Sequence, residues 1–187
     1  MRIITYNVNG IRAAMNKGLV EWVKAAQPDV LCFQETKATP DQVDVKLFEE
    51  LGYHLYWYSA QKKGYSGVAI FSKLKPKHVE YGCGIEKYDF EGRIIRLDFE
   101  HCSVMSVYHP SGSSGDDRQA FKMQWLADFQ QYINELKTKL PATKTSAPAS
   151  INCFPVSKFT PPSTSIKALE PDLIIKSLVC FTLLIVF

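Results

Sequence analysis

Glu35 raises the first chemical question in this sequence of 187 residues. It lies in the polar stretch Gln34–Lys37, which directly follows Val30–Phe33, an apolar run typical of a buried strand. A carboxylate at the end of a buried strand is costly unless it is paired or holds a cation. Taken alone, the segment favours an ion pair between Glu35 and Lys37, and a cation site is the alternative.

Two amide side chains stand where an earlier strand ends. Asn7 and Asn9 follow the extended run Ile3–Tyr6, and Gly10 interrupts it. Taken alone, Asn-x-Asn-Gly is typical of a turn, because Asn and Gly tolerate positive φ. If this strand lies beside the strand that precedes Glu35, Asn7 and Glu35 converge at one sheet end. An amide oxygen and a carboxylate can share a hard cation such as magnesium there.

Tyr108 is the third candidate, because it ends a strand-like run and precedes a loop rich in Pro, Gly and Ser. A tyrosine in isolation is more often a packed ring with its hydroxyl in water. His109 comes next, directly before Pro110. We expect His109 to be exposed in the loop and assign it no role.

Alternating short strands and helices must position these side chains up to about Leu140. Apolar spacing predicts a helix over Gly18–Ala26, and a capping box predicts another from Thr39 to Leu51. A longer helix, Asp117–Lys139, carries an aromatic stripe that we expect to be core. Further strands are predicted at Arg2–Tyr6, Tyr53–Tyr58, Gly67–Ser72, Lys77–Tyr81, Ile94–Phe99 and Ser103–Tyr108. Many strands with few helices indicate packed sheets covered by helices.

The composition changes after Pro141. Residues 141–172 are rich in Ser, Thr, Pro and Ala and have no usable periodicity, which is typical of a linker or a disordered segment. The apolar end, Leu173–Phe187, is interrupted by Lys176 and is shorter than the ~20 residues that cross a bilayer. We therefore predict an α/β domain over 1–140 and, over 141–187, a poorly ordered linker with a short apolar tail that spans no membrane.

The overall composition is that of an ordinary soluble protein, with 46% hydrophobic and 22% charged residues. A net charge of +3 permits a polyanionic partner without indicating one. The five cysteines are scattered and never spaced as CxxC, which makes a poor disulfide framework and a poor zinc site. Together with the lack of a secretory signal at the start, this favours the cytoplasm. Nothing indicates an oligomeric state.

Five segments acquire meaning through their order: "NVNGIRA", "PDVLCFQETK", "GYSGVAIFSK", "EGRIIRLDF" and "VYHPSG". Together they resemble the exodeoxyribonuclease III family of apurinic/apyrimidinic endonucleases, within the endonuclease/exonuclease/phosphatase superfamily. The resemblance covers Met1–Leu140, and "QETK" after an apolar strand is its most specific element. Phosphoinositide phosphatases and sphingomyelinases share the fold, but NVNG, QETK and EGR are more similar to the DNA-repair branch.

The resemblance implies part of a two-sheet α/β sandwich flanked by helices, the first half of this fold, with the active site at one end of the sheets. Glu35 would be the principal ligand of Mg²⁺ or Mn²⁺, Asn7 a metal or phosphate-side ligand, and Tyr108 a catalytic residue that contacts the phosphate. Asn9 and Lys37 are weaker candidates for phosphate and DNA contacts. The implied activity is magnesium-dependent hydrolysis of phosphodiester bonds, with duplex DNA carrying abasic sites or 3′ ends as the partner.

Two further residues match family motifs but can serve the fold alone. Gly67 suits a close approach of backbone segments, and Arg93 suits an ion pair with Glu91 or a neighbour.

Two motifs of the family's second half are absent. No Gly-Asp-x-Asn follows Leu140, no Ser-Asp-His ends the chain, and no histidine follows His109. Asp172 has the wrong context to replace either aspartate. The resemblance therefore implies a truncated member that has the metal half-site without the groups that activate the nucleophile. Whether it is an enzyme or an inactive DNA- or partner-binding fragment stays open.

Packing gives a further expectation. With only part of the second sheet, apolar faces of the first sheet and of the 117–139 helix would stay exposed. The alternative is that the apolar tail supplies a substitute strand.

Overall fold

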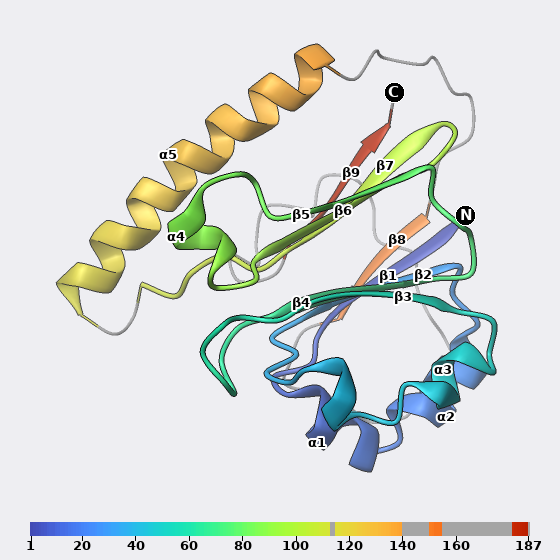
Figure 1. The fold of residues 1–187 in the computed structure, drawn as a ribbon. Helices are drawn as coiled ribbons and strands as arrows, with labels where there is room; N and C mark the ends of the chain where they lie inside the picture. Colours follow the sequence, from blue (N-terminus) through green and yellow to red (C-terminus); the bar gives the residue numbers. More distant parts are fainter. Residues whose placement is uncertain (113–114, 140–149, 155–180, 187) are drawn as a thin grey trace.

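The computed structural model describes residues 1–112 and 115–139, together with the backbone of 150–154 and 181–186. Two β-sheets pack face to face, and helices cover the outer face of each (Figure 1). The described chain therefore has four layers in the order helices, sheet, sheet, helices. The two-sheet α/β sandwich that the resemblance implied is confirmed.

The first sheet has five strands, and β1 is parallel to both of its neighbours. Along β1 and β2 the register pairs Asn7 with Gln34, so the carboxyl ends of both strands lie at one edge of the sheet. This is the adjacency on which the convergence of Asn7 and Glu35 depended. The strand order is β3 (His54–Tyr58), β4 (Val68–Ser72), β2 (Val30–Gln34), β1 (Arg2–Asn7) and β8 (Ser150–Phe154).

The second sheet is antiparallel throughout. Its order is β5 (His78–Tyr81), β6 (Ile94–Asp98), β7 (Cys102–Val107) and β9 (Phe181–Val186). The layer between the two sheets is a core of fully buried side chains, since inward residues of both sheets interdigitate there. These residues are Ile3, Val30, Cys32, Val68, Ile70, Ile95, Leu97 and Val104.

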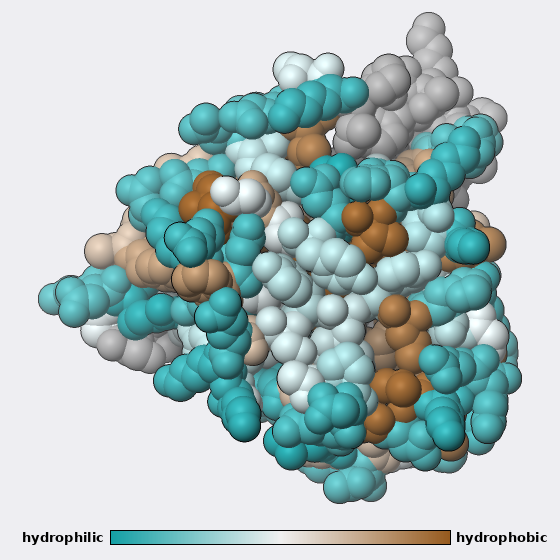
Figure 2. Space-filling view, in the orientation of Figure 1, coloured by the Kyte–Doolittle hydropathy of each residue, from teal (hydrophilic) through white to brown (hydrophobic). Residues whose placement is uncertain are grey.

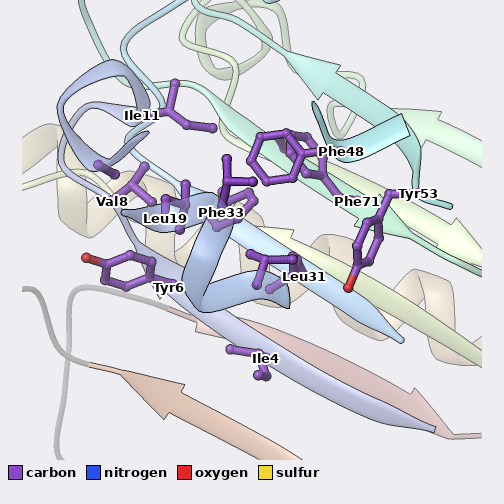
Figure 3. Close-up of a cluster of buried hydrophobic side chains, with 14 of the residues drawn as sticks. Ile4, Tyr6, Val8, Ile11, Leu19, Leu31, Phe33, Phe48, Tyr53 and Phe71 are labelled. Carbon is purple, nitrogen blue, oxygen red and sulfur yellow. The ribbon is translucent and has the colours of Figure 1, made fainter. Parts of the chain in front are cut away.

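Short helices cover the outer face of the first sheet (Figure 1). They are α1 (Ile11–Asn16), α2 (Leu19–Ala26), the single 3₁₀ turn η1 (Pro40–Gln42) and α3 (Lys46–Glu49). Figure 3 shows their contact with the sheet, in which Leu31, Phe33 and Phe71 of the strands meet Leu19 and Phe48. This core fixes β1 and β2 from the side opposite the second sheet.

The outer face of the second sheet carries α4 (Glu86–Asp89) and the long helix α5 (Asp116–Lys139). Trp125, Ile133 and Leu136 of α5 are buried against Ile94 and Met105 of the sheet. The aromatic stripe is therefore core, as predicted. The expectation that this helix face stays exposed is wrong, because β6 and β7 supply enough apolar surface to cover it.

The face of the molecule seen in Figure 2 is mainly polar, and apolar residues reach this face only in small separated areas. The large hydrophobic side chains that remain exposed come from different elements, namely Met1, Leu74, Tyr81, Phe90 and Met123. The described part of the chain contains no helix that is both long and apolar enough to cross a bilayer. Among the cysteines with described side chains, Cys83 and Cys102 are free thiols.

The predicted helix from Thr39 to Leu51 is wrong. Its capping box is present, but it closes only the turn η1. Val43 then has φ −134° and ψ 140°, which is extended backbone, and the helix resumes separately as α3. Val43 packs against the core beside Leu47. Tertiary burial of a β-branched residue here overrides the local helix signal.

Two segments beyond residue 140 are strands. The sequence predicted none at Ser150–Phe154, which pairs with β1, while Phe181–Val186 pairs with β7 and is the substitute strand considered for the tail. The rest of the predicted linker and tail, residues 141–149, 155–180 and 187, lies outside the described residues. The division of the chain at residue 140 stays a prediction.

Candidate active site

Asn7 and Glu35 meet at the carboxyl edge of the first sheet. Asn7 is the last residue of β1, and Glu35 directly follows β2. The side-chain amide of Asn7 donates a hydrogen bond to Glu35 Oε1 over 2.7 Å. Asn7 is only 2% exposed, so this amide is held inside the protein. The predicted convergence of the two side chains is confirmed.

Hydrogen bonds from two loops hold the backbone after β2, and we call this arrangement, which involves residues 9–10, 35–37 and 66–67, the clamp. On one side, the N–H of Gly10 donates to the carbonyl of Glu35 over 2.7 Å. On the other, the N–H of Thr36 donates to the carbonyl of Gly67 over 3.1 Å. Gly67 has φ +86°, and a Cβ there would overlap Thr36 Oγ1. The close approach predicted for Gly67 is confirmed, and it holds Glu35 from the β4 side.

Backbone strain is concentrated at this clamp. Four residues other than glycine adopt positive φ within it: Asn9 at 45°, Glu35 at 54°, Lys37 at 50° and Ser66 at 45°. Each such residue costs of the order of 1–3 kcal/mol, and such strain clusters at functional sites. Thr36 and Ser66 also have buried hydroxyls without a hydrogen-bond partner among the described residues. The contacts on both sides of Glu35 therefore hold this segment in an unfavourable local geometry.

Lys37 forms an ion pair with the second carboxylate oxygen of Glu35. Its Nζ lies 2.9 Å from Glu35 Oε2 and 2.5 Å from Asn9 Oδ1. Asn7 Oδ1 accepts the N–H of Asn9 over 3.0 Å, so all four side chains form one connected cluster. The ion pair that the local sequence favoured is therefore present at the same point as the convergence with Asn7.

Glu35 is ionised at neutral pH. Burial raises the pKa of its carboxyl group, but the hydrogen bond from Asn7 and the ammonium of Lys37 outweigh burial and lower the pKa below its ordinary value. A hydrogen bond from Tyr108 acts in the same direction. Glu35 thus carries a partly buried negative charge, which Lys37 balances.

Tyr108 reaches this cluster from the second sheet, where it directly follows β7. Burial, and then the negative charge of Glu35, raise the pKa of its hydroxyl well above the ordinary value. The hydroxyl therefore stays protonated and is a hydrogen-bond donor. Arg93 fixes the residue: its Nη1 donates to the Tyr108 carbonyl over 2.8 Å, and its guanidinium lies 5.2 Å from the ring centroid.

Arg93 is itself only 1% exposed and is held by a polar network. It pairs with Glu91 at 2.6 Å, as predicted, and donates to the hydroxyl of Tyr65 over 3.2 Å. Arg118 of α5 donates to the same hydroxyl over 2.9 Å. This network ties α5 and the loop before β4 to the backbone that carries Tyr108.

His109 is buried, and the expectation of an exposed loop histidine is wrong. It is 6% exposed and accepts a hydrogen bond at Nδ1 from the indole N–H of Trp125 over 2.7 Å. Burial, followed by the positive charges of Arg93 and Lys122, lowers the pKa of His109 to about 4. A signal for this existed in the α5 stripe, because a buried Trp needs an acceptor for its N–H.

Gln34 is a residue that the sequence reasoning missed. It is fully buried directly before Glu35. Its amide donates to Thr5 Oγ1 over 3.0 Å and to Ser106 Oγ over 2.9 Å, which links both sheets beneath the site. A lone glutamine inside an apolar strand was the available signal, because a buried amide requires partners.

The donor set restricts which cation could bind. Among the residues that the structure describes, no three His, Cys, Asp or Glu side chains come together. Glu35 supplies one carboxylate, and Asn7 and Asn9 supply amide oxygens. Mg²⁺ is commonly held by one or two carboxylates, with waters and substrate phosphates as further ligands, so these residues fit it. They do not fit zinc, which takes His and Cys ligands.

No second carboxylate enters from β8. This strand is the first after α5, the place in chain order where the resemblance expects Gly-Asp-x-Asn. It is parallel to β1, and its register pairs Phe154 with Tyr6, yet its sequence is "SINCF". The strand position is therefore filled, but without an acidic residue.

Comparison with known proteins agrees with this fold. Residues 4–142 match the family model described as the Endonuclease/Exonuclease/phosphatase family. An exodeoxyribonuclease of Bacillus subtilis is 46% identical over 142 residues, which are 75% of this chain and 55% of that protein. A DNA-(apurinic or apyrimidinic site) endonuclease of Dictyostelium discoideum is 36% identical over 143 residues, 75% of this chain and 39% of that protein.

Solved structures show the same relationship. An AP endonuclease from Archaeoglobus fulgidus superposes with a TM-score of 0.62 at 34% identity, covering 71% of this chain and 51% of that chain. The chain thus spans about half the length of such relatives. It belongs to the endonuclease/exonuclease/phosphatase family, and about three quarters of it match the exodeoxyribonuclease III and AP endonuclease branch.

Proposed function

We propose that this chain is a magnesium-dependent DNA repair phosphodiesterase that hydrolyses DNA at abasic sites or at 3′ ends. One observation carries the proposal: an ionised Glu35, bound by Asn7 at 2.7 Å and contacted by Tyr108, at the shared end of two parallel strands. The names of relatives support DNA as the substrate. They include the Dictyostelium abasic-site endonuclease and a Neisseria 3′ phosphatase solved with a product DNA hairpin, which is 27% identical with a TM-score of 0.64.

The oxygen ligands and the hydrogen-bond donors of the site have different roles. Glu35 and Asn7 hold the cation, Mg²⁺ or Mn²⁺, through oxygen ligands. When bound, such a cation would supply neutralisation of the phosphate charge and stabilisation of the leaving oxygen. The protonated hydroxyl of Tyr108 donates to a phosphate oxygen. Asn9 and Lys37 stand beside Glu35, where a donor can contact the DNA backbone.

A second candidate is DNA binding without hydrolysis. It is favoured by the absence, among the described residues, of any group of three or more His, Cys, Asp or Glu side chains. Attack by water requires a base or an orienting group, and β8 brings no acid to the β1 edge. In this candidate the chain binds a partner or DNA with a salt-dependent affinity and does not cut.

One experiment separates the two candidates. The purified full chain is incubated with a duplex that contains a single abasic site, with Mg²⁺ or with EDTA, while anisotropy reports binding to the same duplex. Hydrolysis predicts nicking that needs Mg²⁺, is lost in Glu35→Gln and persists in Glu86→Gln, which changes an exposed carboxylate on α4. Binding that weakens with salt but gives no nicks at any Mg²⁺ concentration refutes the enzyme and supports the second candidate.

A further inference from the structure

Every oxygen that a cation could use at the candidate site already has a hydrogen-bonding partner. Glu35 Oε1 accepts from Asn7, and Glu35 Oε2 lies 2.9 Å from the ammonium of Lys37. Asn7 Oδ1 accepts the N–H of Asn9, and Asn9 Oδ1 accepts from Lys37. The ammonium is therefore the group that contributes positive charge where Glu35 and Asn9 converge.

The contacts of Lys37 resemble those of a bound cation more than those of an ordinary surface ion pair. An exposed pair usually shares one carboxylate contact and contributes about 0–1 kcal/mol. Here the ammonium has two oxygen ligands from two different loops, and the side chain of Glu35 is only 14% exposed. The side chain of Lys37 keeps 33% of its surface exposed, so it has room to leave toward solvent.

We infer that Lys37 is a built-in counter-ion of the metal site, which withdraws from Glu35 when a divalent cation binds there and is then free to contact phosphate. The inference rests on the proposed function, since it assumes that Glu35 holds a cation. It adds that cation binding and Lys37 compete for one carboxylate, so that the empty site is neutralised by the chain itself.

Backbone hydrogen bonds hold Glu35 and Lys37 independently of the ion pair between their side chains. The N–H of Lys37 is fixed by the carbonyl of Ser66 over 2.9 Å, and Glu35 is held through Gly10 on the other side. The clamp therefore stays in place while only the lysine stem rotates. Lysine suits this role, because its compact ammonium sits on a flexible four-carbon stem.

A fixed ion pair gives a different expectation. Replacing Lys37 removes a positive charge from the site in either case, so tighter Mg²⁺ binding is required by competition but does not prove it. If Lys37 competes, Mg²⁺ must also expose its ammonium, whereas in a fixed pair the ammonium stays on Glu35. The exposure of Lys37 with and without Mg²⁺ therefore distinguishes the two roles.

Calorimetry with MgCl₂ on the full chain tests the inference. Lys37→Met keeps the length of the side chain and removes its charge, and Lys24→Met on α2 is the matched control at an exposed lysine. We expect at least about fivefold tighter Mg²⁺ binding in Lys37→Met and no change in Lys24→Met, because that factor is the upper end for an exposed ion pair and this pair has more contacts. Equal affinity in all three proteins overturns the exchange but leaves the proposed function standing. No binding in any of them refutes the proposed cation site and the exchange together.

Lysine labelling of the wild-type chain gives a readout that needs neither a variant at Lys37 nor enzymatic activity. Acetylation at a limiting reagent concentration is followed by mass spectrometry, with Lys24 as the internal reference. We expect Mg²⁺ to increase modification of Lys37 several-fold. In Glu35→Gln, Lys37 should be modified readily with or without Mg²⁺. Labelling of Lys37 that does not respond to Mg²⁺ in the wild type, while calorimetry detects binding, overturns the exchange.

Discussion

His109 should make folding stability depend on pH in a way that one substitution removes. The pKa of this histidine is about 4 in the folded protein and 6.5 as its ordinary value. Between these two values the unfolded chain binds a proton that the folded chain does not bind. The free energy of unfolding therefore falls as the pH decreases from 6.5 to 4. The part of the stability that depends on a neutral His109 is complete above pH 6.5.

The magnitude follows from the shift. One pKa unit corresponds to about 1.4 kcal/mol, so the difference between 6.5 and about 4 gives a loss of ~3 kcal/mol. The loss belongs to a group that is only 6% exposed, so solvent screens it little. Below pH 4, His109 contributes no further dependence.

His109→Asn tests this reasoning. The Asn oxygen can still accept from Trp125, but the side chain does not titrate. The variant loses ring contacts with Trp125 and Phe129, which lowers its stability at pH 7 by about 1–3 kcal/mol. Its additional loss between pH 6.5 and 4 should be ~3 kcal/mol smaller than that of the wild type.

Urea unfolding at half-unit steps from pH 4 to 7.5, followed by tryptophan fluorescence, measures both losses. Because carboxylates titrate in the same range, the difference between proteins is compared rather than the total. His54→Asn on β3 changes an exposed histidine and should keep the full acid-side loss. If His109→Asn loses as much stability as the wild type over this range, the buried neutral histidine is refuted.

Two further predictions concern the supports of the site. Gly67→Ala should destabilise the fold by about 2–4 kcal/mol, because the new Cβ overlaps Thr36 Oγ1 at a backbone of φ +86°, whereas Gly64→Ala, at φ +70° with open space around it, should cost about 1 kcal/mol. Equal losses of stability in Gly67→Ala and Gly64→Ala, measured by thermal unfolding, would contradict the close approach of Gly67 to Thr36. Arg93→Met should cost about 3 kcal/mol, because Glu91 loses a buried partner, and a cost near zero would show that the network does not hold Tyr108.

Much of the site could be predicted because its signals are local. A buried strand that ends in Gln34 and Glu35 and another that ends in Asn7 each show an apolar run followed by polar groups. Local patterns could not predict the pairing of the two strands, because the paired residues are 27 positions apart in the sequence. The sequence left this pairing as a condition, and the parallel register of β1 and β2 meets it and accounts for the contact between Asn7 and Glu35.

Where the sequence failed, tertiary contacts decided the structure. His109 has a loop context but is buried because Trp125 requires an acceptor and α5 covers it. The break at Val43 follows core packing and not the capping signal. Ser150–Phe154 has little strand pattern, yet its backbone pairs with the free side of β1, whose N–H and C=O groups need partners.

Mg²⁺ calorimetry on the folded wild-type chain and on Glu35→Gln tests the cation site directly. We predict saturable uptake by the wild type and by the control Glu86→Gln, and loss of uptake in Glu35→Gln, because the amide keeps the shape of the side chain and removes its charge. Uptake of Mg²⁺ by Glu35→Gln with the wild-type affinity, or none by the folded wild type, would contradict a cation site at Glu35.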